Sequence, residues 1–406
     1  MKAGKWILLL LAFASFFYLS SVPNFASDKE PIPIGCVVSL TGYLSDLAQD
    51  MVEGIECAIE DINSTGGLLG RQIKLFVRDD ELKPPVGVRR LEDLIKKNKI
   101  VMHIGFIHSA TAMAAQQTGE KENWGVPFMN MMSVPSLEGP GKLPSFGFLI
   151  GSSGEAYGLA GGEYTAQNLG KKAFLLYVDY AWGTDIRDAF VRSIKANGGE
   201  IVGTIAVPGG TADYQPFLTQ IMGSKADYVV FIINGTMFIN CMKQAYSLGL
   251  KDKMKCVSAW SSAQQVDACG PEVIKDVTLI SDYYWDIPYE RNKIFVEKFM
   301  KKFGKEKRPS LHHYYTYAGV NMWANVVKKI RTEDPKTVIA NIPGLKGDFG
   351  KGEIEVRSTG DHTTIQNIFV LRGNGPDDMK NKLDTQKLLK VYSGEKYFYS
   401  AKEKGW

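Results

Sequence analysis

Apolar residues along the chain follow two alternating periods, one typical of strands and one of helices. Residues 34–40 are almost continuously apolar, and the apolar positions within residues 51–62 then recur at helical spacing. Further strands are predicted at residues 73–77, 100–104 and 126–129. Strands that alternate with helices are typical of a parallel sheet whose two faces are covered by helices.

A second set of the same elements follows the first. Strands are predicted at residues 173–178 and 228–233, and helices at 186–194 and 242–246, each with glycine soon after its end. The segment 146–154 between the two sets is rich in glycine and serine, as expected of a crossing between folded units. The pattern predicts an α/β protein with two Rossmann-like lobes, each built on a parallel sheet.

The first 27 residues have the order of a secretory signal peptide. Lys2 and Lys5 precede an uncharged apolar run at residues 6–19, and small residues are frequent in 20–27. A helix that spans a membrane needs about 20 apolar residues, so this run is short for one. We therefore expect removal of residues 1–27 and export to the periplasm, with an uncleaved membrane anchor as the alternative.

The exported chain is expected to be nearly neutral. The sequence has 48 basic and 44 acidic side chains, and loss of Lys2 and Lys5 leaves 46 basic ones. This balance favours neither a nucleic-acid-binding protein nor one held on an anionic membrane. The 406 residues, 45% of them hydrophobic, are enough for two lobes of ordinary size.

The sequence lacks the motifs of common catalytic sites. It contains no GxxxxGK[ST] phosphate loop, no GxGxxG after the first strand and no GxSxG nucleophile turn. His312 and His313 are neighbours, whose side chains point apart on a helix, and no cysteines form a CxxC pair. We therefore predict no enzyme, no cofactor and no metal site. Cys256 and Cys269 are candidates for a disulfide, with buried free thiols as the alternative.

Several segments, taken in chain order, carry a resemblance to one known family. The most specific is AIEDINSTGGLLGR at residues 58–71. The segments together are residues 32–42, 54–80, 104–115, 179–183, 244–250 and 316–320. They resemble the type I periplasmic binding proteins of the branched-chain amino acid (leucine/isoleucine/valine) family, which serve ABC transporters.

This resemblance implies a domain organisation and partners. The chain would cross between lobes three times, through a hinge of three strands. Lobe one would hold residues 31–151 and 284–358, and lobe two would hold residues 152–283 and 359–406. The ligand would lie in the cleft between the lobes, and the closed protein, a monomer, would dock on an ABC-type membrane permease.

Candidate ligand-binding residues of lobe one follow predicted strands, because ligands bind beyond the carboxyl ends of parallel strands. Ser109, Ala110 and Thr111 open a predicted helix, which Ser109 or Thr111 can cap. The free N–H groups of the helix start suit a ligand carboxylate, although an ordinary N-cap is the alternative. The resemblance adds the hydroxyl of Ser133 and the carbonyl of Met132, where turn chemistry is the alternative.

Candidate residues of lobe two are mainly aromatic. By resemblance, Trp182 occupies a position that often lines the ligand, and Tyr180 can assist it. Asn234 and Trp260 follow predicted strands, with turn or packing roles as the alternative. The acidic partner that holds a ligand ammonium in this family has no counterpart near Trp260, and Asp282 is the possible substitute. Otherwise the ligand lacks an amine, and the aromatic residues suit an aromatic carboxylate.

The sequence therefore predicts the substrate-binding component of an ABC importer, which closes on a branched-chain amino acid or a similar small carboxylate. One alternative is a binder of an amine-free aromatic carboxylate or amide. Another is a stand-alone ligand sensor that signals to a membrane receptor. The sequence features that separate these alternatives are the residues that would face a ligand ammonium.

Overall fold

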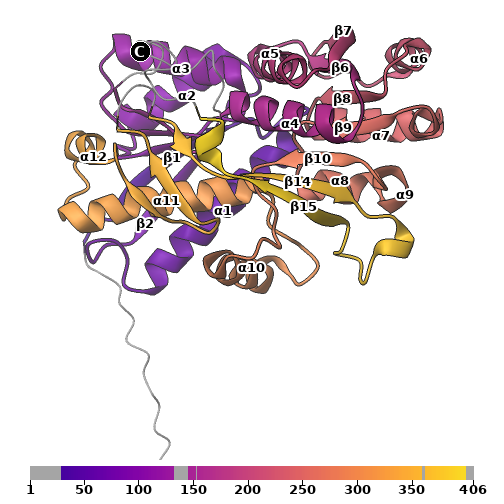
Figure 1. The fold of residues 1–406 in the computed structure, drawn as a ribbon. Coiled ribbons are helices and arrows are strands. Elements are labelled where there is room, and N and C mark those ends of the chain that lie inside the picture. The colour runs from indigo at the N-terminus through magenta and orange to yellow at the C-terminus, as the bar shows by residue number, and fades with distance from the viewer. Residues whose placement is uncertain (1–28, 132–144, 152, 359–361, 399–406) are drawn as a thin grey trace, which may run out of the picture.

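The computed structural model describes residues 29–131, 145–151, 153–358 and 362–398. These residues form two α/β bodies side by side, each with a central sheet and flanking helices (Figure 1). The predicted signal sequence at residues 1–27 lies outside the described residues. No helix of the described part combines the length and the apolar character needed to cross a membrane.

The first sheet has five parallel strands in the order β2-β1-β3-β4-β5. Since β1 lies between β2 and β3, the strand order reverses there, which leaves a crevice at the carboxyl ends of β1 and β3. The strands are β1 (Ile32–Val38), β2 (Ile73–Asp79), β3 (His103–Gly105), β4 (Phe128–Asn130) and β5 (Gly147–Leu149). The helices between them are α1 (Ser45–Ser64), α2 (Pro84–Lys96) and α3 (Ser109–Lys121).

The second sheet has seven strands in the order β15-β14-β10-β9-β8-β6-β7. The order reverses around β6, which places a second crevice at the carboxyl ends of β6 and β8. The strands are β6 (Lys172–Val178), β7 (Glu200–Val207), β8 (Tyr228–Ile232), β9 (Lys255–Ser258), β10 (Thr278–Ser281), β14 (Ile368–Gly373) and β15 (Gln386–Tyr392). Its helices are α4 (Gly154–Asn168), α5 (Ala181–Ala196), α6 (Gln215–Gly223), α7 (Gly235–Ser247), α8 (Ala263–Cys269) and α9 (Pro271–Ile274).

The second sheet combines the predicted parallel part with an antiparallel edge. β14 pairs with β10 in antiparallel fashion, and β15 pairs with β14 in the same way. The connection at residues 374–385 joins β14 directly to β15, because antiparallel neighbours need no helical crossover. The parallel part, from β10 to β7, matches the prediction.

The chain passes between the two bodies three times. It leaves the first sheet after β5 for α4, returns after β10 to α10 (Glu290–Phe303), and leaves again from β13 to β14. The returning segment continues with α11 (Leu311–Ile330), α12 (Pro335–Asn341) and a small sheet of β11 (Lys346–Asp348), β12 (Glu353–Val356) and β13 (Thr364–Ile365). The exact limits of the two lobes stay a prediction.

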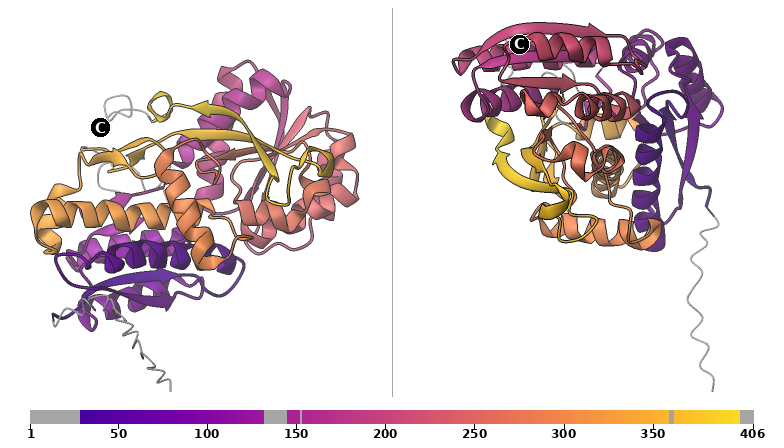
Figure 2. Two further views of the ribbon diagram at one scale, coloured as in Figure 1. Left: turned by 90° about the horizontal axis from the view of Figure 1, so that it is seen from below. Right: turned by 90° about the vertical axis from the view of Figure 1, so that its right-hand side faces the viewer.

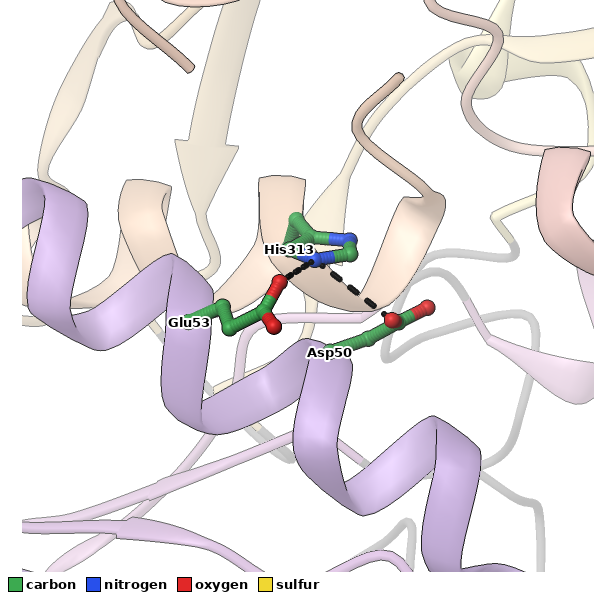
Figure 3. A group of neighbouring side chains, drawn as sticks. All are labelled: Asp50, Glu53 and His313. Atoms are coloured by element: carbon green, nitrogen blue, oxygen red, sulfur yellow. Dashed lines mark hydrogen bonds and ion pairs between the residues drawn. The ribbon is translucent and has the colours of Figure 1, made fainter. Parts of the chain in front are cut away.

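Helices α1 and α11 lie against each other although about 250 residues separate them in the sequence (Figure 2). Most residues of both helices are buried, and charged side chains join them within the contact. Figure 3 shows Asp50 and Glu53 of α1 directed at His313 of α11. The Nε2 atom of His313 lies 2.9 Å from Glu53 and 3.5 Å from Asp50.

The protonation of His313 follows from its other contacts. The backbone N–H of Ser310 donates to Nδ1 of His313 over 3.0 Å, so Nδ1 carries no proton and Nε2 donates to Glu53. The hydroxyl of Ser310 donates to Asp50, and Lys307 forms an ion pair with Glu53. Burial alone would raise the pKa of Glu53, but the bonds from His313 and Lys307 outweigh it and lower this pKa to about 2.

The Glu53→Gln variant should lose about 1–3 kcal/mol of unfolding free energy at pH 7, because buried hydrogen bonds to a charged group are lost. The wild-type advantage should shrink as pH falls from about 4.5 toward 2, since the lowered pKa of Glu53 favours the folded state only while Glu53 is ionised. The control is Glu60→Gln, also on α1, which removes an exposed ion pair with Lys302 of α10. It should lose about 0.5 kcal/mol or less of unfolding free energy. Chemical denaturation of the wild type and both variants measures these unfolding free energies. Equal losses in the two variants would contradict a stabilising role for the contacts of Glu53 with His313 and Lys307.

Candidate functional site

The carboxyl edge of the first sheet presents the start of α3. Ser109 follows β3, is buried, and has a hydroxyl group that lacks a hydrogen-bond partner among the described residues. Helix α3 has 13 residues, and its first N–H groups point out of the helix start with the positive end of the helix dipole. Together with the Ser109 hydroxyl, these N–H groups make this a place where an anion can be held.

The predicted capping of α3 is wrong. The N-cap residue is His108, and no side chain caps the helix. The hydroxyl of Thr111 instead lies 3.0 Å from Nδ1 of the His108 ring. The methyl group of Thr111 faces α2, since a Cβ atom on Gly87 would lie only 2.3 Å from it. Thr111 therefore holds His108 and α2 in place, while Ala110 beside it is exposed.

The carboxyl edge of the second sheet carries three of the other predicted residues. Trp182, Asn234 and Trp260 follow the parallel strands β6, β8 and β9 and are all buried. The rings of Trp182 and Trp260 lie 5.4 Å apart, and the amide of Asn234 donates to the Tyr180 hydroxyl over 3.3 Å. The structure thus brings these side chains together, as strands that end at one edge require.

The two edges meet across the gap between the bodies. The ring of His108 lies 6.2 Å from that of Tyr180, and the ring of His312 on α11 lies 4.9 Å from that of Trp260. The backbone of Tyr43, after β1, touches Gly235 of α7, where an added Cβ atom would lie 2.5 Å from the Tyr43 carbonyl oxygen. Gly235 also has a φ of 58°, so both the close approach and the left-handed backbone favour glycine there. These contacts describe two bodies that are closed on each other.

Asp282, the possible ammonium partner, follows β10 and is fully buried. Lys351, also buried, donates to the backbone carbonyl of Asp282 over 2.5 Å and to the Tyr315 hydroxyl over 3.3 Å. Burial lowers the pKa of Lys351 to about 8, and the negative charge of Asp282 limits that shift. The charge of Asp282 therefore already has a positive neighbour within the protein.

Tyr157 connects Asp282 to the aromatic residues. Its hydroxyl oxygen accepts a hydrogen bond from Nε1 of Trp260 over 2.6 Å. Burial, and then the nearby carboxylate of Asp282, raise the pKa of Tyr157 well above its ordinary value. Tyr157 thus stays protonated, and it fixes the orientation of the Trp260 ring.

Two predictions concern residues of other kinds. Met132 and Ser133 lie outside the described residues, so their roles stay predictions. All five cysteines are buried and free, and the candidate bond between Cys256 and Cys269 is not formed. Burial raises the pKa of both thiols to about 12, which makes them unreactive.

Among the described residues, one group has the composition of a metal site, namely Asp50, Glu53 and His313. A metal ion on Nε2 of His313 would require the proton on Nδ1, where the backbone N–H of Ser310 already donates. The ammonium of Lys307 also occupies the positive position beside Glu53. The contacts of this group are those of an ion-pair network that joins two helices.

Sequence reasoning missed several residues of the site. His108 could have been found, because it lies three residues after the end of β3 and strand ends line such sites. His312 was considered only as half of a histidine pair. Tyr157 and Lys351 gave no signal, since their partners Trp260 and Asp282 lie about 100 and 70 residues away in the sequence.

Comparison with known proteins agrees with this architecture. A family model described as periplasmic binding protein matches residues 31–379. The Leu/Ile/Val-binding protein homolog 7 of Brucella suis biovar 1 (strain 1330) is 23% identical over 351 residues, which cover 80% of this chain and 84% of that protein.

Two solved structures share the fold over most of their length. An amino acid ABC transporter substrate-binding protein from Pseudomonas fluorescens Pf-5 has a TM-score of 0.84 at 21% identity, with 93% of this chain and 99% of the other covered. A solute-binding protein of an ABC transporter from Rhodopseudomonas palustris BisB5, in complex with 3,4-dihydroxybenzoic acid, has a TM-score of 0.80 at 24% identity, with 90% and 98% covered.

The buried Lys351 predicts a distinct pH dependence. Because its pKa is about 8 in the folded chain and about 10.5 when unfolded, the unfolded chain binds more protons between these values. Wild-type stability should therefore rise relative to Lys351→Met by up to about 3 kcal/mol from pH 8 to 10.5. Urea denaturation at several pH values tests this. Lys305→Met, at an exposed lysine, should follow the wild-type curve, and a Lys351→Met curve parallel to both would contradict the prediction.

Proposed function

Since the chain belongs to the periplasmic binding protein family, whose members bind solutes and are not enzymes, we propose that it is the substrate-binding component of an ABC importer. The ligand is a small carboxylate held between the carboxyl ends of the two sheets. The observation that carries the proposal is the contact between the bodies at the start of α3, where the ring of His108 lies 6.2 Å from that of Tyr180. The Tyr180 ring in turn neighbours Trp182, which lies against Trp260. The proposal places the anion site and the aromatic wall around one ligand.

The carboxylate is assigned to the start of α3. The free N–H groups there and the Ser109 hydroxyl are donors without other partners among the described residues, which suits an acceptor-only carboxylate. Ala110 adds its backbone N–H, and Asn234 lines the opposite side. Met132 and Ser133 remain proposed contacts on the first-sheet side.

The proposed ligand is a branched-chain amino acid or a similar small carboxylate. Asp282 would receive the ammonium of an amino acid, but Lys351 already compensates its charge. That observation favours the second candidate, an amine-free aromatic carboxylate or amide, whose ring the Trp182 and Trp260 faces would cover. The two candidates differ in one group, the ammonium, and so can be separated directly.

The proposed cycle is opening and closing about the three crossings. Lobe one comprises residues 31–151 and 284–358, and lobe two comprises residues 152–283 and 359–406. The ligand contacts both lobes only when they are closed, so it shifts the population toward the closed form. The closed monomer then docks on a membrane permease, after export to the periplasm by a signal peptide that is cleaved from the chain.

A thermal-shift screen of purified residues 28–406 tests the proposal. Ligand at about 100 times its dissociation constant adds about 2.7 kcal/mol to the unfolding free energy, which gives a clear rise in melting temperature. The panel holds leucine, valine, benzoate, phenylacetate, succinate and acetamide. We expect a rise with at least one carboxylate. A panel without any shift would argue against a small-carboxylate binder.

The Trp182→Ala variant should bind the ligand found in that screen at least tenfold more weakly, equivalent to about 1.4 kcal/mol, because the ring contacts Trp260 at the closed site. Isothermal titration calorimetry measures the change. Tyr246→Ala removes an exposed aromatic ring on α7 and serves as the matched control with unchanged affinity. A loss below about threefold in Trp182→Ala would place this ring outside the site.

A further inference from the structure

His312 lies at the first turn of α11, where that helix meets the second sheet. It is fully buried, and its ring meets the Trp260 ring edge-on at 4.9 Å with an interplanar angle of 74°. Trp260 cannot turn away easily, because its Nε1 atom is bonded to Tyr157. The imidazole of His312 therefore faces a fixed aromatic wall of the proposed ligand site.

Both ring nitrogens of His312 lack hydrogen-bond partners among the described residues. The neighbouring His313 is different, since its two ring nitrogens contact Ser310 and Glu53. The hydroxyl of Ser261, which directly follows Trp260, is also buried without a partner among the described residues. Buried polar atoms without partners are unfavourable, and for two such side chains next to Trp260, one in contact with it and one adjoining it in the chain, a ligand is the natural partner.

The charge of this polar group is zero at neutral pH. Burial, together with the nearby His313, lowers the pKa of His312 to about 3, so its neutral ring has one donor and one acceptor nitrogen. The Ser261 hydroxyl can likewise donate and accept. A ligand group that is itself uncharged and both donates and accepts, such as a hydroxyl or an amide, matches this environment. A charged group would find no opposite charge on these two side chains.

A row of rings connects this polar group with the start of α3. From His108 the row runs through Tyr180, Trp182 and Trp260 to His312, with successive centroids 6.2, 6.2, 5.4 and 4.9 Å apart. The row has a donor-rich anion site at one end and an uncharged polar group at the other. The apolar faces between them suit the body of a ligand.

From this arrangement we propose that His312 and Ser261 bind an uncharged hydroxyl or amide group at the end of the ligand opposite its carboxylate. The ligand class is thereby an amine-free hydroxy or amide carboxylate with an apolar, ring-sized body. This inference rests on the proposed carboxylate-binding function and deepens it, because it names the group that distinguishes the ligand from an amino acid.

The experiment compares matched acids of three lengths that differ only in a hydroxyl group. The pairs are benzoate and 4-hydroxybenzoate, phenylacetate and 4-hydroxyphenylacetate, and 3-phenylpropionate and 3-(4-hydroxyphenyl)propionate. Dissociation constants are measured by titration calorimetry for the wild type, His312→Phe, His312→Asn and Ser109→Ala, with leucine as the amino acid probe. Melting curves without ligand establish that each variant is folded.

In the wild type, at least one hydroxylated acid should bind tenfold or more tightly than its partner. This ratio should fall to within about twofold in His312→Phe and recover in part in His312→Asn, whose amide can donate and accept. Ser109→Ala should weaken both members of the pair and keep the ratio, because it acts at the carboxylate end. If His312→Phe does not fold, the inference is tested by the affinity ratio in the wild type and by the ratio in His312→Asn.

Three results would overturn the inference. Equal binding of both members of every pair in the wild type removes the hydroxyl site, and an unchanged ratio in His312→Phe removes His312 from it. Preferential binding of leucine over every amine-free acid would mean that the site recognises an ammonium and not an uncharged group. The proposed carboxylate-binding function would still stand. Absence of binding by every acid, leucine included, would reject the proposed function itself, and the inference with it.

Discussion

The direction of the strands is the constraint on which the site depends. All strands of the first sheet run parallel, as do β6 to β10 of the second, so each sheet has one edge at which strands end and loops begin. The carboxyl edges of the two sheets lie on the sides of the bodies that face each other. Residues far apart in the sequence, such as Ser109, Trp182 and Trp260, therefore all lie at these carboxyl edges. Helix starts arrive at the same edges, which brings positive dipole ends to a site that is otherwise aromatic.

Charges near this space are compensated by the protein itself. Lys351 lies against Asp282 at a crossing between the bodies, and Asp50 and Glu53 are satisfied by Ser310, His313 and Lys307. Ser109 and His312, whose polar side-chain atoms have no hydrogen-bond partners among the described residues, are both uncharged groups. The proposed binding space would hold its shape through fixed charges outside it and select through neutral hydrogen bonds and ring faces within it.

Periodicity predicted the elements whose signal is local. Strand β6 and helix α1 agree closely with the sequence pattern, because long buried strands and amphipathic helices each bury one regular set of positions. Strands β3 and β4 are shorter than predicted. Strands β11 to β13 have too few residues to show a period, whereas β14 has a buried apolar run that the prediction missed. Among the proposed site residues, the strand-end rule pointed to Asn234 and Trp260, and the resemblance pointed to Trp182. Lys351 and His312 escaped it because their surroundings are assembled by tertiary packing alone.

The capping of α11 has a consequence for how this region tolerates change in chain length. Ser310 and His313 form a reciprocal cap that is tied to α1, and His312, one position earlier than His313, faces the aromatic row. Successive residues of a helix are turned by about 100°, so one residue added before His312 would turn His312 to the side that faces Asp50 and Glu53 and turn His313 away from it. Trp260 would then lose its imidazole neighbour, and His313 would lose its contacts with Ser310 and Glu53. The spacing between the loop after α10 and the cap is therefore under a length constraint that substitutions alone would never reveal.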